Sequence, residues 1–180
     1  MFGLLKKTVF TRLGWIGIVG RRSRVVYVTM GHRHETSAWR RLHSARFAAD
    51  PARAADTHDA ADWLDVLADR LEAYAAGQLD DFRDVKIDLD RHTRFQRQVL
   101  RACRRIDYGH TASYTDLATR CGSPGAARAV GNVMANNRLP LIIPCHRVVG
   151  SAGRLGGFSA PGGLATKRRL LELESAHVLC

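Results

Sequence analysis

The sequence predicts a mixed α/β (α+β) protein with a small α/β unit in its first half and a helical unit in its second. Three observations carry this prediction. Short apolar runs flank a turn-like segment within residues 9–30, apolar residues recur at helical spacing in 57–76, and the pattern turns helical and basic after about residue 91. In a chain of 180 residues, which is long enough to bury a core, we expect two domains, 1–90 and 91–180.

The first half should begin with a β-hairpin. The apolar runs at residues 15–19 and 25–28 have the length and composition of strands, and Gly20–Arg24 between them is typical of a turn. Arg12 and the arginines of the turn leave too few consecutive apolar residues for a signal sequence or a membrane span. We interpret the region as the first strands of a soluble fold.

A helix and a further strand should follow the hairpin. Residues 57–76 carry five apolar side chains at helical spacing, and Gly77 is the stop signal. These side chains are Trp63, Leu64, Leu67, Leu71 and Tyr74. Residues 85–89 alternate between apolar and polar side chains and are predicted to form a strand. Residues 46–56 have no clear period, which favours a loop or a frayed helix.

The cysteines and histidines favour neither a disulfide scaffold nor a metal centre. The four cysteines lie far apart without a Cys-x-x-Cys pair, which argues against a zinc ribbon and favours a reducing compartment, so we expect a cytoplasmic protein. They are Cys103, Cys121, Cys145 and Cys180. His32, His34 and His43 have no matching ligands nearby, and we interpret them as solvated loop residues rather than metal ligands.

Positive charge is concentrated in the second half. Residues 1–90 hold 14 Lys and Arg against 13 Asp and Glu, whereas residues 91–180 hold 14 against 4. Such a basic excess suits DNA, RNA or an anionic membrane, and it can also serve solubility alone. It becomes informative only beside a motif that reads DNA.

The second half should open with a basic amphipathic helix followed by a helix-turn-helix. Phe95, Val99 and Ala102–Cys103 form an apolar stripe. Arginines occupy the opposite face: Arg97, Arg101, Arg104 and Arg105. Further on, Ser113 with an acid three residues later has the form of a helix cap, and Gly122 ends that first short helix.

The second short helix is predicted to start at a Ser123 cap, with Pro124 in its first position, and to run to about Ala135. Four side chains should face the core: Ala126, Val130, Val133 and Met134. The outer face holds Pro124, Gly125, Arg128, Gly131, Asn132 and Ala135. Such a bare face could approach the narrow minor groove with Arg128 as a wedge, or the small residues could simply permit close helix packing.

A thiol and an imidazole are neighbours at Cys145 and His146, after the apolar run 139–143 that we predict to be a buried strand. A nucleophilic thiol needs a base or an electropositive neighbour that lowers its pKa, and His146 and Arg147 could supply both. The alternative is a small buried cysteine beside an ordinary hydrogen-bonded histidine. The dipeptide alone does not decide between them.

The wider pattern resembles the O6-alkylguanine-DNA alkyltransferases, also called methylated-DNA–protein-cysteine methyltransferases. The resemblance covers about residues 91–174 and rests on several ordered motifs. They are Thr93-x-Phe95-Gln96, Ser113-Tyr114-x-x-Leu117-Ala118, Gly122-x-Pro124-x-Ala126-x-Arg128-Ala129-Val130-Gly131, Asn137, Pro144-Cys145-His146-Arg147-Val148 and Lys167-x-x-Leu170-Leu171-x-x-Glu174. The first half fits the family's ribonuclease-H-like domain in length and in its strand-helix pattern.

The resemblance implies catalytic roles. Cys145 would attack the alkyl carbon of an everted base, His146 would act as its base through water, and Glu174 would orient the imidazole. Spacing also favours Glu174 over Glu172, because Glu174 follows Leu170 and Leu171 on their inward face. Asn137 would bond the turn that carries the cysteine, with a helix C-cap as its plainer alternative.

The resemblance also implies a substrate pocket and a DNA interface. Tyr114 would donate to guanine N3 and help rotate the phosphate, and Val148 and Ser159 would bind the base. Gly157 and Phe158 would belong to the glycine-rich loop 150–163 that forms the pocket wall. Phe158 replaces a more common tyrosine, and the stretch from Ser159 to Gly163 is longer than usual. DNA contacts would come from Arg128, Ala126, Ala127, Gly131, Ser113 and Tyr114.

The implied function is single-turnover repair of O6-alkylguanine, and less well of O4-alkylthymine, in double-stranded DNA by a monomer without cofactor, metal or membrane. Two other classes remain open. One is a module that flips and flags alkylated bases without transfer, which the presence of Cys145 disfavours. The other is a cysteine hydrolase, which would leave the bare helix around Arg128 unexplained.

Overall fold

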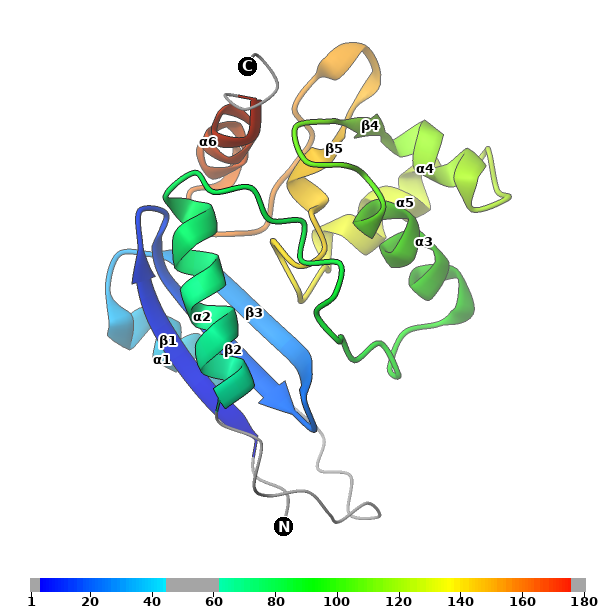
Figure 1. Cartoon of the computed structure of the whole chain (residues 1–180). Helices are drawn as coiled ribbons and strands as arrows, with labels where there is room; N and C mark the ends of the chain where they lie inside the picture. Colours follow the sequence, from blue (N-terminus) through cyan, green and yellow to red (C-terminus); the bar gives the residue numbers. More distant parts are fainter. Residues whose placement is uncertain (1–3, 45–61, 176–180) are drawn as a thin grey trace. The chain divides into compact units, whose positions relative to one another are not determined.

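A computed structural model describes residues 4–44 and 62–175 (Figure 1). The segment 46–56, the first residues of the helix predicted from residue 57, and Cys180 lie outside the described residues. Contacts divide the chain into unit 1, made of Met1–Gln78 and Val85–Asp88, and unit 2, made of Leu79–Asp84 and Leu89–Cys180. Helices and small sheets occur together, so the predicted mixed α/β class is confirmed.

Unit 1 is built on a three-stranded antiparallel sheet in the order β1 (Leu5–Thr11), β2 (Gly14–Arg21) and β3 (Arg24–His32). The predicted hairpin is therefore confirmed and gains a preceding strand. Its turn is only two residues long, Arg22 and Ser23, both with φ of 53°. Positive φ at both turn positions gives the twist that flanking antiparallel strands require.

Two helices cover the sheet of unit 1, with α2 (Asp62–Ala75) in front and α1 (Glu35–Ser44) behind in Figure 1. Their packing explains two strand glycines. A Cβ on Gly17 would lie 2.9 Å from Leu42 of α1, and one on Gly20 would lie 2.4 Å from Trp63 of α2. The predicted apolar face of α2 is largely confirmed, since Leu64, Leu67, Leu71 and Tyr74 are buried.

Two expectations for unit 1 are wrong. Residues 85–89 form no strand; the segment makes an isolated bridge at Ile87, where its backbone exchanges hydrogen bonds with Val25 of β3. The histidines are not all in loops either. His32 ends β3, with Nε2 2.7 Å from the Thr29 hydroxyl, and His43 lies in α1 with Nδ1 2.9 Å from the Trp39 carbonyl.

Unit 2 contains the helices α3 (Arg94–Arg104), α4 (Tyr114–Arg120), α5 (Ala127–Ala135) and α6 (Gly163–Ser175). Thr93 and Ser113 cap α3 and α4 with reciprocal capping boxes. The predicted start of the first short helix at Ser113 is therefore confirmed, while the cap at Thr93 was not predicted. A short parallel pair, β4 (Ala112–Ser113) and β5 (Val148–Val149), ties the start of α4 to the chain just after the Pro144–Val148 motif.

The predicted cap of the second short helix is wrong. The helix begins at Ala127, and Ala126 precedes it without a side-chain cap. Ser123 instead starts a turn, in which its carbonyl accepts from the Ala126 N–H at 2.9 Å. Proline and glycine in the middle of that turn favour it over a helical start. The predicted inward residues Val130, Val133 and Met134 are buried, and Arg128 is exposed.

The apolar run 139–143 is a buried turn, not the predicted strand. Leu141 has φ of +71°, and the Ile143 N–H donates to the Leu139 carbonyl at 2.8 Å. Pro140 has no N–H, which weakens any ladder through this segment. Apolar composition was thus a correct sign of burial and an incorrect sign of extended backbone.

Candidate active site

Cys145 opens a single 3-10 turn, Cys145–Arg147, and its side chain is buried with 6% of the residue exposed. Asn137 fixes the approach to this turn. Its Nδ2 donates to the Ile143 carbonyl at 2.9 Å, and its Oδ1 accepts from the Leu139 N–H at 3.0 Å. One asparagine therefore satisfies backbone groups at both ends of the buried segment, and it places the cysteine two residues after a pinned carbonyl.

His146 is buried and hydrogen-bonds to Glu174, with Nε2 2.9 Å from Oε1. Burial lowers the pKa of His146, although the Glu174 carboxylate opposes that shift, so the ring is neutral near pH 7. A carboxylate can only accept, which places the proton on Nε2 and leaves a lone pair on Nδ1. Nδ1 is buried without a hydrogen-bond partner among the described residues. The imidazole is thus oriented as a proton acceptor.

Arg147 clamps the carboxylate that holds His146. Its Nε donates to Glu174 Oε2 at 2.9 Å and its Nη2 to Oε1 at 2.8 Å, while Nη1 donates to the Ile106 carbonyl at 2.7 Å. Burial would raise the pKa of Glu174, but the hydrogen bonds from His146 and Arg147 and the charge of Arg147 outweigh it and lower the pKa to about 2. Glu174 is fully buried, whereas Glu172 is exposed.

The electropositive neighbour of the thiol differs from the one we expected. Burial raises the pKa of Cys145, opposed by the Asn137 hydrogen bond and by the charge of Lys167; Arg147 is committed to Glu174. Lys167 is fully buried and donates to the Val148 carbonyl at 2.5 Å. Cys145 at rest is therefore a protonated thiol, which makes a base during the reaction more important than a preformed thiolate.

Tyr114 lies at the start of α4 against the glycine-rich loop. A Cβ on Gly156 would lie 2.5 Å from the Tyr114 hydroxyl oxygen, and one on Gly131 of α5 would lie 3.9 Å from the ring. Burial raises the pKa of Tyr114, and Cys145 adds to the shift, so the phenol keeps its proton. The absence of a side chain at Gly156 therefore lets Tyr114 pack against the loop, whereas a Cβ at Gly131 would only make an ordinary contact with the ring.

The loop residues predicted to bind substrate are gathered after β5. Phe158 is half-buried, and Gly157 and Ser159 are exposed. The Val148 carbonyl accepts from Lys167, whose Nζ also lies 3.5 Å from the Gly156 carbonyl. One ammonium group therefore links the end of the cysteine turn to the loop. Lys167 belongs to one of the family motifs in the sequence, but no role was predicted for it. Its position three residues before Leu170, on the buried side of α6, was the available signal.

The residues predicted to contact DNA do not form one uniform surface. Arg128 is exposed on α5, while Ala126, Ala127 and Gly131 are half-buried near it. The Ser113 hydroxyl caps α4, where its oxygen accepts a hydrogen bond from the Asp116 N–H at 3.0 Å. Arg128 is thus the long cation on a surface of small side chains.

Within residues 4–44 and 62–175, no three His, Cys, Asp or Glu side chains are grouped so that they could hold a metal ion. No helix in the same ranges is long and apolar enough to cross a membrane.

Known proteins resemble this chain along most of its length. The family described as 6-O-methylguanine DNA methyltransferase, DNA binding domain, matches residues 94–176. The crystal structure of Mycobacterium tuberculosis O6-methylguanine methyltransferase matches with a TM-score of 0.72 and 37% identity, over 97% of this chain and 94% of that chain. This chain belongs to the O6-methylguanine-DNA methyltransferase family. The resemblance found in the sequence is confirmed.

Other members of the O6-methylguanine-DNA methyltransferase family agree with this assignment. A crystal structure of Mycobacterium tuberculosis OGT in complex with DNA matches with a TM-score of 0.70 and 36% identity over 95% of this chain and 93% of that chain. The methylated-DNA–protein-cysteine methyltransferase of Mycobacterium bovis is 50% identical over 109 residues, 61% of this chain. That aligned stretch spans 64% of the relative's own length.

Proposed function

We propose that this chain repairs O6-alkylguanine in double-stranded DNA by moving the alkyl group to Cys145. The Sγ–carbon bond forms as the O6–carbon bond breaks, the thiol proton passes to His146, and the departing guanine takes up a proton. The observation that carries the proposal is the buried Cys145 beside His146, whose Nε2 is bonded to Glu174 and whose Nδ1 lone pair is unoccupied.

The roles of the surrounding residues follow from their chemistry. His146 takes the thiol proton, directly or through one water, as general base. Glu174 keeps the His146 proton on Nε2, and Arg147 positions Glu174. Asn137 fixes the turn that carries the cysteine, and Lys167 links that turn to the glycine-rich loop. Tyr114 keeps its proton and can donate it toward the purine, which makes dealkylated guanine a better leaving group.

The substrate must leave the duplex before it can react. The alkyl carbon on O6 of guanine is enclosed in stacked DNA, so in-line attack by a buried sulfur requires an everted nucleotide. Arg128, exposed among small side chains of α5, would fill the space left in the helix. Val148, Gly157, Phe158 and Ser159 would line the pocket for the base, and Ala126, Ala127, Gly131 and Ser113 would face the DNA.

The reaction would consume the protein. A thioether on Cys145 has no evident route of release, so each chain acts once, as a monomer that needs no cofactor. Cytoplasmic residence suits a reactive thiol, since reducing conditions keep cysteines free.

Intact mass spectrometry tests the proposal. Incubation with a duplex that contains O6-methylguanine should add about 14 Da per chain, at most once, on the peptide that contains Cys145. A module that only flips and flags the base would bind the duplex without a mass change. A cysteine hydrolase would turn over acyl substrates and leave its own mass unaltered at completion.

Arg128→Ala should slow repair in duplex DNA about tenfold or more, while reaction with a free O6-alkylguanine base changes less than twofold. A free base leaves no gap in a duplex, so its reaction does not need Arg128 to fill one. Single-turnover rates on both substrates measure the split. Arg168→Ala, which removes an exposed arginine from α6, is the matched control and should change neither rate. Equal losses on both substrates would refute the wedge role.

A further inference from the structure

Three ring-bearing side chains cross one end of the sheet in unit 1. Phe10 of β1 pairs with Trp15 of β2, and Trp15 pairs with His32 of β3. Directly paired residues of antiparallel strands project from the same face, so the rings form a row across the three strands. The Phe10 and Trp15 ring centroids are 5.3 Å apart with a 54° tilt. Three strands at their usual spacing give this row a length of about 10 Å.

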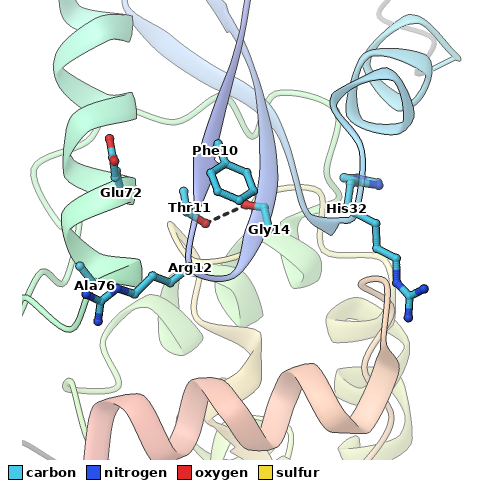
Figure 2. A pocket seen from close by; sticks show the side chains of 8 residues that line it. Phe10, Thr11, Arg12, Gly14, His32, Glu72 and Ala76 are labelled. Atoms are coloured by element: carbon cyan, nitrogen blue, oxygen red, sulfur yellow. Dashed lines mark hydrogen bonds between the residues drawn. The ribbon is translucent and has the colours of Figure 1, made fainter.

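Phe10 is 61% exposed, an unusual position for a phenylalanine. It borders a hollow of about 600 Å³ at this end of the sheet (Figure 2). Its lining includes Phe10 of β1, Arg12 of the β1–β2 turn, His32 at the end of β3, Arg33 directly after it, and Glu72 of α2. Phe10 and His32, the two ends of the row, therefore line a concave surface, whereas Trp15 between them is not among its lining residues.

The turn that carries Arg12 has a defined shape. The Thr11 hydroxyl donates to the Gly14 carbonyl at 2.8 Å, as drawn in Figure 2, and accepts from the Leu13 N–H at 3.0 Å. Gly14 has φ of +91°, and a Cβ there would lie 2.7 Å from the His32 carbonyl oxygen. The turn thus approaches β3 closely, which holds Arg12 at the same hollow as His32.

The charges around the hollow favour an anion. Arg12 and Arg33 are exposed cations on its lining, against one carboxylate, Glu72. Burial lowers the pKa of His32, and the charge of Arg41 adds to this shift, so the imidazole offers a neutral ring near pH 7. Flat rings beside guanidinium groups are the combination that binds unpaired bases by stacking and phosphates by charge.

We infer that this hollow binds a short stretch of single-stranded DNA, with bases stacked on Phe10 and His32 and phosphates on Arg12 and Arg33. The lining residues belong to unit 1, whereas Cys145 belongs to unit 2, and the binding does not depend on alkyl transfer. A single strand fits better than a duplex because the faces of paired bases are already covered by their neighbours. Unit 1 would thereby hold unpaired DNA.

Tryptophan fluorescence tests this site selectively, because Trp15, Trp39 and Trp63 all belong to unit 1. An oligothymidine of about 12 nucleotides should quench the native chain as it binds. Phe10→Ala should weaken the binding seen by quenching about tenfold, and Arg33→Ala should lower the salt dependence of log K by about 0.7. Glu72→Gln should strengthen binding a few-fold by removing the one acid.

Two control variants separate the site from general charge. Val66→Ala removes an exposed apolar side chain of α2, and Arg40→Ala removes an exposed arginine of α1; both should bind like the native chain. Methyl transfer to Cys145 should be unchanged in the Phe10 and Arg33 variants. The inference is overturned if the oligothymidine does not quench, or if these two variants bind it within twofold of the native chain. It is also overturned if a blunt duplex quenches as strongly and with the same dependence on Phe10.

Discussion

A chain with alanine in place of Cys145 is expected to transfer no alkyl group while it binds methylated duplex as tightly as the native chain. The Cys145 sulfur is the nucleophile that His146 would deprotonate, so transfer stops without it. The proposed DNA contacts involve other side chains. Cys145 is buried, so its truncation leaves a small void that should cost about 1 kcal/mol and leave the fold intact. Intact mass and duplex binding by anisotropy measure the two expectations.

Cys103→Ala is the matched control. Cys103 is fully buried on α3, and burial holds the pKa of its thiol well above the usual range, so it is a poor nucleophile. This variant should still gain about 14 Da from methylated duplex. A mass gain in the Cys145→Ala chain, on any other cysteine, would contradict the assignment of the acceptor.

Local features of the candidate site were predictable because they depend on short separations in sequence. Cys145 and His146 are covalent neighbours, and the predicted cap at Ser113 joins residues only three positions apart. The inward placement of Glu174 follows from its helical spacing to Leu170. Such relations do not depend on the tertiary fold, because local backbone geometry fixes them.

The features that sequence reasoning missed depend on long-range partners. The run 139–143 reads as a strand, but a turn became possible because the Asn137 side chain satisfies two of its backbone groups. The segment 85–89 alternates like a strand, yet its pairing with β3 is an isolated bridge at Val25. Apolar pattern reports burial more reliably than backbone conformation, because both conformations can satisfy the same core.

Four ionisable residues are buried at the candidate site, and most of their charge cancels. Glu174 and Arg147 neutralise each other, and His146 is neutral, so Lys167 is the cation whose charge acts on Cys145. Lys167 is held by carbonyl oxygens, which stabilise a cation only partly. A thiolate that forms as the proton moves to His146 would therefore meet a positive field already in place, without rearrangement of charged groups.

Glu174→Gln is expected to slow methyl transfer about a hundredfold or more and to destabilise the fold by about 3 kcal/mol. A glutamine amide can donate as well as accept, so it no longer fixes the His146 proton on Nε2, and Nδ1 loses its assured role as the proton acceptor. The fold is destabilised because the buried Arg147 guanidinium loses its counter-ion. Single-turnover rates and urea unfolding measure the two effects. Glu172→Gln changes an exposed carboxylate on the same helix and should alter neither quantity.

The stability loss should depend on pH in a defined direction. The pKa of Glu174 falls from 4.5 to about 2 on folding, so its contribution is complete above about pH 4.5 and is lost as the pH falls toward 2. That lowering corresponds to about 3 kcal/mol at neutral pH. The difference in unfolding free energy between the native and Glu174→Gln chains should therefore shrink steadily below about pH 4.5. A difference that stays constant down to about pH 3 would mean that the carboxylate charge is not what stabilises this cluster.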